Sequence, residues 1–305
     1  MTVAAMLRII FIGCGDVALR TARLLPARTR LYGLIRRPEA APALQAAGIT
    51  PIHGDLDYRI LTTHLRTAPF AVVHLASPGM EGNEDRRTRR LLAALSRAAV
   101  LPQRYVYVST TGVYGDCHGQ RVNETHPRTT RTARGRRRVD AENVLRHWAT
   151  RHRVRLSVLR VAAIYDAARL PLDNIRRGMP VLLPEHDIYL NRIHTDDLAR
   201  ALWAALFRGR PNRAYNVADN AELKMGAYFE MLAEAFALPL PPRVSWEEAE
   251  RTIAPMLLSF MSESRRLDTR RLREELRVAL RYPDPQTFLA EWRGKSVPGQ
   301  LPLPL

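Results

Sequence analysis

The chain has 305 residues, of which 46% are apolar and 25% charged, a balance typical of globular proteins. Its formal net charge is +17, and arginine supplies almost all of it, since Lys224 and Lys295 are the only lysines among 47 basic residues. No apolar run approaches the ~20 residues of a membrane-spanning helix. The two cysteines, Cys14 and Cys117, form neither a metal-binding pattern nor a disulfide framework. We therefore expect a cytoplasmic protein without a metal site.

The first half of the chain alternates short apolar runs with longer amphipathic segments. Residues 1–12 lack the basic and cleavage regions of a signal peptide, so we interpret them as leading into a first strand. We expect strands at 7–12, 31–35, 49–53, 71–75, 105–109 and 156–161, and helices at 17–25, 40–47, 86–99 and 136–151. Strands that alternate with helices predict an α/β fold, a Rossmann-type doubly wound parallel sheet.

The alternation becomes less regular after residue 165. We expect a helix at 196–207, a strand at 214–217, a helix at 225–236, a break at 239–242, and helices at 247–260 and 269–276. Residues 1–165 are predicted to form the Rossmann domain, with its sheet completed by segments near 188–220. Residues 166–295 are predicted to form mainly a smaller C-terminal α/β substrate cap. The tail at 296–305 holds three prolines and a glycine, and we expect it to be flexible.

A glycine-rich loop follows the first predicted strand. Its sequence is Gly13-Cys14-Gly15-Asp16-Val17-Ala18, which fits the pattern G-x-G-x-x-A. The first glycine permits a tight turn, the second lets the backbone approach a pyrophosphate, and the small Ala18 lets the helix pack against the strand. The helix N-terminus would then offer N–H groups to the phosphates. A strand before the loop and a helix after it predict a dinucleotide site, whereas the loop pattern alone would also suit an ordinary turn.

The end of the second predicted strand bears on the choice of cofactor. NAD sites usually carry an acidic residue there, which binds the ribose hydroxyls. This chain has Arg36 and Arg37 instead. Their guanidinium groups could hold a 2′-phosphate, or they could be two solvated side chains in an arginine-rich protein. We favour NADP as the cofactor, with NAD as the alternative.

Further segments extend along nearly the whole chain and resemble the extended short-chain dehydrogenase/reductases of the NAD-dependent epimerase/dehydratase family, in an atypical form. They are Gly54-Asp55-Leu56, His74-Leu75-Ala76-Ser77, Val108-Ser109-Thr110-Thr111-Gly112-Val113-Tyr114-Gly115-Asp116, Glu124-Thr125-His126-Pro127, Leu159-Arg160, Ile164-Tyr165, Asn191-Arg192-Ile193-His194-Thr195-Asp196-Asp197-Leu198-Ala199, Tyr215-Asn216-Val217-Ala218-Asp219 and Ser264-Arg265-Arg266-Leu267-Asp268. The run from Ser109 to Asp116 is the most specific of these.

The resemblance implies a role for several residues. Asp55 would bond the adenine amino group, and Leu56 would pack on the adenine ring. The segment Leu75-Ala76-Ser77 would line the cofactor ribose. Thr110 matches the catalytic Ser/Thr that bonds the substrate oxygen, while His194 and Asp197 match a motif that helps connect the sheet to the cap.

The catalytic helix departs from the family pattern. The family carries the motif Tyr-x-x-x-Lys, whose Lys lies four residues before a Glu. Counting back from Glu142 puts Arg138 at the Lys position and Arg134 at the Tyr position. Arg138 could keep a ribose or phosphate contact, but arginine stays protonated, so Arg134 cannot cycle a proton as tyrosine does. Three alternatives remain open. Another hydroxyl could act (Thr110, Thr111, Tyr114 or Tyr165), Arg134 could clamp an anionic substrate, or the protein could sense NADPH without redox chemistry.

Six arginines lie close together before and within this helix: Arg128, Arg131, Arg134, Arg136, Arg137 and Arg138. They could form an anion pocket, contact nucleic acid as some atypical relatives do, or simply be solvated. The segment has no aromatic platform of the kind that single-strand binders use, so we do not expect a nucleic-acid partner. We expect a small, anionic or nucleotide-sugar-like substrate, no membrane partner, and a monomer or homodimer. An oxidoreductase or epimerase is the leading interpretation, and a non-catalytic NADPH sensor is the alternative.

Overall fold

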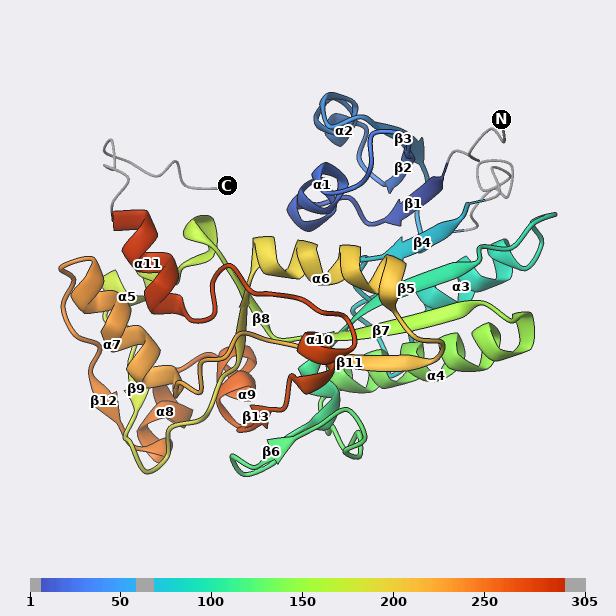
Figure 1. The fold of residues 1–305 in the computed structure, drawn as a ribbon. Coiled ribbons are helices and arrows are strands. Elements are labelled where there is room, and N and C mark those ends of the chain that lie inside the picture. The colour runs from blue at the N-terminus through green and yellow to red at the C-terminus, as the bar shows by residue number, and fades with distance from the viewer. Residues whose placement is uncertain (1–6, 59–68, 294–305) are drawn as a thin grey trace.

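The computed structural model describes residues 7–58 and 69–293, and within them seven parallel strands form a single large sheet (Figure 1). Its order is β11-β7-β5-β4-β1-β2-β3. The strands are β1 (Arg8–Ile12), β2 (Arg30–Ile35), β3 (Ile49–His53), β4 (Ala71–His74), β5 (Arg104–Thr110), β7 (Arg155–Val161) and β11 (Arg213–Val217). The predicted doubly wound α/β fold is confirmed. The expected tail at 296–305 and the first six residues lie outside the described part of the chain.

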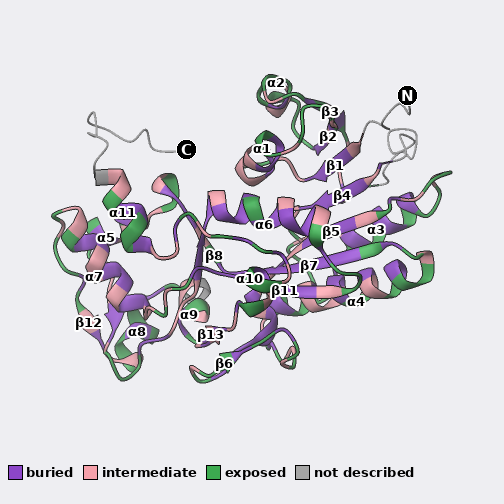
Figure 2. Ribbon diagram, in the orientation of Figure 1, coloured by how far each residue is buried: buried purple, intermediate pink, exposed green. Residues whose placement is uncertain are grey.

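Helices cover both faces of this sheet (Figure 2). One layer holds α1 (Asp16–Arg23), α2 (Ala41–Ala46), which follows the short η1 (Pro38–Ala40), and α6 (Thr195–Arg208). The other holds α3 (Arg86–Leu95) and α4 (Ala133–His152). Side chains alternate along β1, with Ile9 and Phe11 packing in the first layer and Ile10 and Ile12 in the second. A strand buried on both faces explains why its sequence is a continuous apolar run.

The chain runs from β1 outward to β3, then returns through β4 towards β11. The direction therefore reverses between β1 and β4, and in open α/β sheets ligands bind in the crevice at the carboxyl ends of the strands where this happens. The predicted glycine loop lies at that crevice, directly after Ile12.

The C-terminal part forms a smaller unit with its own core of apolar residues, which includes Tyr165, Tyr228 and Leu232. Its elements are β8 (Ala163–Tyr165), which pairs with β10 (Arg192–His194), β9 (Val181–Leu182), which pairs with β12 (Arg243–Val244), η4 (Ala167–Arg169), α5 (Leu172–Arg176), α7 (Met225–Ala235), α8 (Trp246–Thr252), α9 (Pro255–Met261) and α11 (Pro285–Arg293). A separate apolar cluster is formed by residues of η3 (Thr111–Tyr114), β6 (Arg121–Val122) and its partner β13 (Arg266–Leu267), whereas α10 (Arg270–Glu274) packs in the first layer of the large sheet, next to β11.

The single helix expected at 247–260 is wrong, because two helices, α8 and α9, occupy this stretch. Ala254 has the extended angles φ −56° and ψ 137°, and Pro255 begins α9. A proline ring disfavours helical angles in the residue before it and lacks the N–H that a continuous helix would use. Most other elements lie within a few residues of their expected ends. The helix α4, for example, begins at Ala133 because the Thr132 side chain accepts a hydrogen bond from Gly135 N.

Candidate functional site

The glycine loop is shaped for a close approach between two backbone segments. Gly13 has φ +89°, and a Cβ at this position would lie 2.7 Å from the backbone nitrogen of Ala76. That nitrogen donates to Ile12 O at 2.8 Å, so β4 holds the loop tightly. The buried Ala18 lets α1 pack against the sheet. These features fit the cradle that a dinucleotide pyrophosphate needs at a helix N-terminus.

A cavity of about 340 Å³ opens beside this loop. It is lined by eight residues predicted to bind the cofactor: Gly13, Cys14, Gly15, Arg36, Arg37, Asp55, Leu56 and Ala76. It is also lined by Gly54, which belongs to a segment quoted for the family resemblance, and by four residues for which no role was predicted: Leu34, Ile35, Ala40 and Arg87. The remaining predicted residues lie outside this lining. Asp16, Val17, Ala18, Leu75 and Ser77 lie next to the loop or the strand ends, and Arg138 lies on α4. Segments after β1, β2, β3 and β4 thus meet around one space large enough for an adenosine group.

Two arginines at the end of β2 are exposed at this cavity. Neither Arg36 nor Arg37 forms an ion pair with any residue that the structure describes, so their donors are available to a ligand. Arg87 of α3 differs, because it donates to both carboxylate oxygens of Asp57 and, at 3.1 Å, to Ser77 O. One guanidinium therefore ties the loop after β3 to the loop after β4. Sequence reasoning missed Arg87, because no motif marks it among the arginines of its helix.

Asp16, predicted to bind the cofactor, begins α1 and faces two arginines. Its carboxylate accepts from Arg20 at 2.9 Å and from Arg169 of η4 at 3.1 Å. Burial alone would raise the pKa of Asp16, but the hydrogen bonds from these arginines outweigh it and lower that pKa. The side chain therefore links the glycine loop to the C-terminal unit as an ionised carboxylate.

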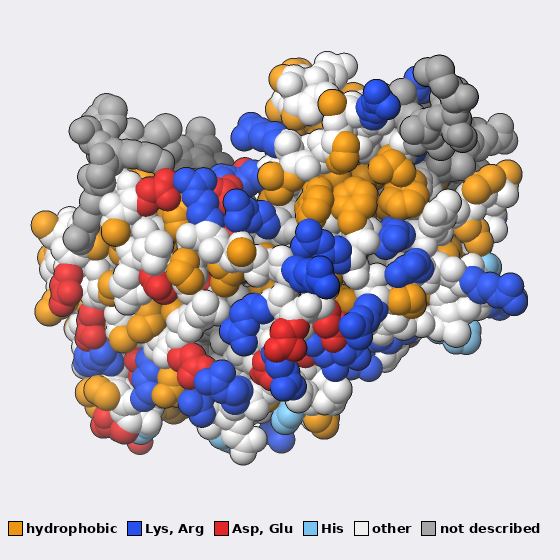
Figure 3. Space-filling view, viewed as in Figure 1, with side chains coloured by type: hydrophobic (Ala, Val, Ile, Leu, Met, Phe, Trp, Pro, Cys, Tyr) orange, Lys and Arg blue, Asp and Glu red, His pale blue; other side chains and the backbone are white. Residues whose placement is uncertain are grey.

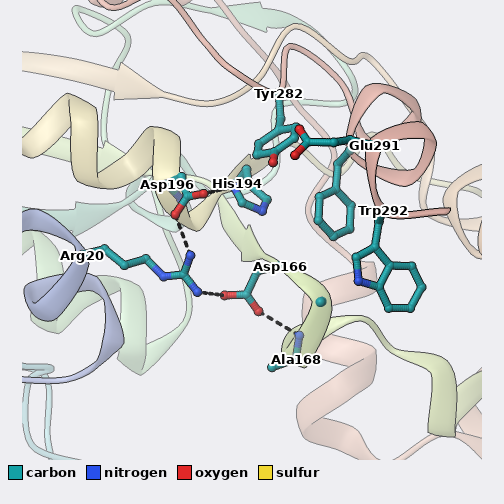
Figure 4. A pocket seen from close by; sticks show the side chains of 10 residues that line it. Arg20, Asp166, Ala168, His194, Asp196, Tyr282, Glu291 and Trp292 are labelled. Carbon is teal, nitrogen blue, oxygen red and sulfur yellow. Dashed lines mark hydrogen bonds and ion pairs between the residues drawn. The ribbon is translucent and has the colours of Figure 1, made fainter. Parts of the chain in front are cut away.

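A second cavity of about 300 Å³ lies at the junction of the two units (Figure 4). Arg20 reaches across it to Asp196 at 2.5 Å and to Asp166 at 3.6 Å. The His194 ring contacts Tyr282, with 4.2 Å between centroids, and its Nδ1 accepts from Asp196 N. Burial lowers the pKa of His194, so the ring is neutral. This cavity holds none of the residues predicted to bind cofactor or to act in catalysis. Its Arg20 pairs with Asp166 and Asp196, and its Glu291 pairs with Arg281 outside the lining.

The predicted catalytic hydroxyl lies at the carboxyl end of β5. Thr110 caps η3, and its Oγ1 accepts from Gly112 N at 3.2 Å, which leaves the hydroxyl proton available to a ligand. The neighbouring Thr111 is 6% exposed. Tyr114, another candidate, is already engaged: its hydroxyl donates to Asn216 and accepts from Arg160.

Tyr165, the last candidate hydroxyl, is buried in the core of the C-terminal unit. Its ring packs on His194 and Phe288, and its hydroxyl has no hydrogen-bond partner among the described residues. Burial raises the pKa of Tyr165 well above its ordinary value, which removes it from proton transfer at neutral pH.

The two arginines at the positions of the family's Tyr and Lys contact other protein groups. Arg134 donates to Ser259 Oγ at 2.7 Å and to Ser259 O at 3.2 Å, and its guanidinium lies 3.7 Å from the centre of the Phe260 ring. Burial lowers the pKa of Arg134 below its ordinary value, yet the group stays charged at neutral pH. Arg138 donates to Val108 O at 2.8 Å and to Tyr107 Oη at 3.0 Å.

The arginines around them do not share one pocket. Arg137 donates to Gly82 O, Arg128 reaches Glu142 and Asn143, and Arg136 is exposed. On the face drawn in Figure 3, basic side chains form separate groups with acidic ones among them.

Below this region, α4 is fixed to the sheet by a buried ion pair. Glu142 is fully buried, and its carboxylate accepts from Arg160 at 2.8 Å and from Ser109 Oγ at 2.7 Å. Burial alone would raise the pKa of Glu142, but the hydrogen bonds from Arg160 and Ser109 and the charge of Arg128 lower it. The pair sets the position of the helix that carries Arg134 and Arg138.

A carboxylate from the segment after α9 lies on the same side of Gly112 as Thr110. Glu263 is 8% exposed and pairs with Arg265 at 3.1 Å. Its Oε2 and the Oγ1 of Thr110 lie 3.9 and 3.6 Å from the same point, the position that a Cβ on Gly112 would occupy. Sequence reasoning missed Glu263, although it directly precedes the quoted segment Ser264-Arg265-Arg266-Leu267-Asp268, which gave the only signal for its place.

The cysteines have no features of reactive thiols. Burial raises the pKa of the Cys14 thiol to about 12, and the sulfur contacts Phe11 O. Cys117 is also buried, and burial raises its pKa as well. Within residues 7–58 and 69–293, no group of His, Cys, Asp and Glu is arranged to hold a metal ion, and no helix is long and apolar enough to cross a membrane.

Comparison with known proteins agrees with this geometry. The family model described as the NAD dependent epimerase/dehydratase family matches residues 18–218. A functionally unknown conserved protein from Silicibacter pomeroyi DSS is 30% identical and has a TM-score of 0.78, with 95% of this chain and 99% of that chain covered. No curated protein sequence matches the chain significantly.

Two further solved structures share the fold. MoeE5 in complex with UDP-glucose and NAD is 22% identical, with a TM-score of 0.73 and coverage of 94% of this chain and 99% of that chain. DesIV, a dTDP-glucose 4,6-dehydratase from Streptomyces venezuelae with NAD and DAU bound, is 18% identical, with a TM-score of 0.75 and coverage of 95% and 97%.

Proposed function

The chain belongs to the NAD-dependent epimerase/dehydratase family, and from this premise we propose that it is an NADP-dependent oxidoreductase acting on a small anionic carbonyl or alcohol compound. One observation carries the proposal. The cavity beside the glycine loop brings Gly13 and Gly15 together with two exposed arginines, Arg36 and Arg37. A 2′-phosphate would meet both guanidinium groups there, and charge-assisted bonds of this kind are among the strongest that side chains make.

Thr110 supplies one of the contacts that a carbonyl reduction needs besides the cofactor. When bound, the cofactor would deliver a hydride to the carbonyl carbon. The carbonyl oxygen, as its π bond breaks, would accept a hydrogen bond from Thr110 and take up a proton from solvent. Arg134 would attract an anionic group of the substrate.

Nucleotide sugars are one substrate class that suits this site. UDP-glucose is bound by MoeE5, and compounds of this class are anionic because they carry a diphosphate next to the sugar. The positive charge of Arg134, which forms no ion pair with a described residue, favours an acidic sugar or another anionic carbonyl compound. As part of the same proposal, the protein acts in the cytoplasm as a monomer or homodimer.

Titration of the purified protein with NADPH and with NADH, followed by nicotinamide fluorescence and thermal shift, tests the proposal. We expect both cofactors to bind and NADPH to bind more tightly. Loss of absorbance at 340 nm is then followed with a panel of carbonyl compounds that includes 4-keto and acidic nucleotide sugars. Binding of neither cofactor would refute the proposal.

One observation favours a second function, that of a non-catalytic NADPH sensor. Arg134 and Arg138 both bond to protein groups, so the helix that normally carries the catalytic pair serves to hold other elements in place. Tight NADPH binding without turnover of any compound in the panel would support this alternative.

A further inference from the structure

The adenosine end of the cofactor cavity contains two kinds of arginine. Arg36 and Arg37 are exposed and make no ion pair with a described residue. Arg87 lines the same cavity but comes from α3, and its side chain is 23% exposed. The difference in their partners suggests that they meet different parts of a ligand.

The guanidinium of Arg87 is fixed in one plane. Its Nε donates to Asp57 Oδ1 at 2.7 Å, its Nη2 donates to Asp57 Oδ2, and its Nη1 donates to Ser77 O at 3.1 Å. These contacts take three of the five N–H donors of arginine, and the carboxylate offsets its charge. What such a group offers a ligand is mainly its flat face.

The loop on which Arg87 rests is fixed as well. Arg90, one helical turn further along α3, donates to Leu56 O at 3.2 Å. The Asp55 side chain accepts from Asp57 N at 2.8 Å, which closes a tight turn. Asp55, Leu56 and Arg87 thus belong to one rigid group at the cavity, and the cavity is also lined there by Gly54 and Ala76, which are small enough to leave room for a ring.

We propose that Arg87 stacks its guanidinium on the adenine ring of the bound nucleotide, and that Asp57 and Ser77 O position it for this contact. The proposal rests on the proposed cofactor site. A planar guanidinium held by a bidentate carboxylate is the arrangement in which arginine stacks on flat π systems. Adenine recognition is then separate from the recognition of the 2′-phosphate, which belongs to Arg36 and Arg37.

The two roles predict different binding patterns. A stacking contact acts on every adenine nucleotide, whether or not it carries a 2′-phosphate. Replacement of Arg87 should therefore weaken NADPH, NADH and ADP by the same factor. Stacking of a base is worth enough for a factor of about ten in affinity.

The experiment uses isothermal titration of the full chain with NADPH, NADH and ADP, on the variants Arg87→Lys and Arg87→Gln. Arg86→Gln is the matched control, since Arg86 is exposed on the same helix, loses the same charge and does not line the cavity. We expect Arg87→Lys to bind all three ligands about tenfold more weakly, with an unchanged melting temperature of the unliganded protein. Lysine can keep the ion pair with Asp57, and with it the tie between the loops, but it has no flat face.

Three outcomes would overturn the proposal. Wild-type affinity in Arg87→Lys would mean that Arg87 only ties the loops together. A loss of affinity confined to NADPH would mean that the charge of Arg87 binds the 2′-phosphate. An equal loss in Arg86→Gln would mean that any positive charge on α3 suffices. Failure of the wild-type protein to bind NADPH or NADH would refute the proposed function itself, and ADP binding to the wild type would still test the stacking contact.

Discussion

Arginine serves two different purposes at the two ends of the cleft. At the adenosine end, Arg36 and Arg37 are exposed and have no ion-pair partner among the described residues. At the other end, Arg134, Arg138 and Arg160 each bond to groups of the protein. The exposed cations are available to an anionic ligand, whereas Arg138 and Arg160 hold elements in position. Arg134 also holds an element in position, but it forms no ion pair with a described acidic residue and keeps its charge for a substrate anion. A high net charge by itself therefore does not locate the binding site.

The largest effect should come from breaking the buried pair under α4. We expect Glu142→Gln to lower the free energy of unfolding by about 3–5 kcal/mol, because it leaves Arg160 buried without a countercharge. Urea unfolding measures this loss. Glu84→Gln, at an exposed ion pair, is the control and should change stability by less than about 0.5 kcal/mol. If Glu142→Gln were as stable as the wild type, the buried pair of Glu142 and Arg160 would not hold α4 in position.

The same pair predicts a pH dependence with a definite sign. The pKa of Glu142 is lower in the folded protein than in the unfolded chain. Its contribution is therefore present above the ordinary glutamate pKa and is lost as the pH falls through the lowered value. Wild-type stability should fall more steeply in acid than that of Glu142→Gln, and urea midpoints measured from pH 7 downward check this. Parallel pH profiles would contradict it.

A smaller effect should follow from changing an exposed arginine. We expect Arg36→Glu to invert the preference between NADPH and NADH, with a swing of at least about tenfold, because a carboxylate repels the 2′-phosphate and can accept from ribose hydroxyls. Fluorescence titration of both cofactors measures it. Arg30→Glu, at the opposite end of β2, is the control. An unchanged cofactor preference in Arg36→Glu would mean that Arg36, although exposed, does not bind the 2′-phosphate.

A still smaller effect is expected at Arg134. We predict that Arg134→Ala costs about 1 kcal/mol of stability through the lost contacts with Ser259 and Phe260, and leaves the Kd for NADPH within about twofold of wild type. Thermal denaturation and NADPH titration measure the two quantities, with the exposed Arg136→Ala as control. A large loss of NADPH affinity would place Arg134 among the ligand-binding arginines.

The smallest signal should come from the thiol in the glycine loop. With a pKa of about 12 for Cys14, only about one molecule in ten thousand carries the thiolate at pH 8. We expect iodoacetamide to label the folded protein very slowly and the urea-unfolded chain rapidly, as mass spectrometry of the peptide would show. Rapid labelling of the folded protein would mean that the loop is open rather than packed against Phe11 O.

The sequence predicted the fold better than the candidate site, for a physical reason. Buried parallel strands need continuous apolar runs, and a tight turn beside β4 needs glycine. The strand at Ile9–Ile12 and the turn at Gly13 can therefore be recognised from the sequence alone. Arg87 and Glu263 come near the site only through folding, since one lies on α3 and the other follows α9. The break between α8 and α9 has a signal in the sequence, because Pro255 disfavours helical angles at Ala254, but the prediction of a single helix at 247–260 did not use it.

The contact between Arg134 and the α9 residues Ser259 and Phe260 also restricts how this sequence can change over evolutionary time. Placing the family's tyrosine at position 134 would remove the cation from the Phe260 ring and both donors from Ser259 in a single step. Such a change would become favourable only after compensating changes in α9. The two segments, separated by more than one hundred residues, are therefore expected to vary together among descendants of this sequence.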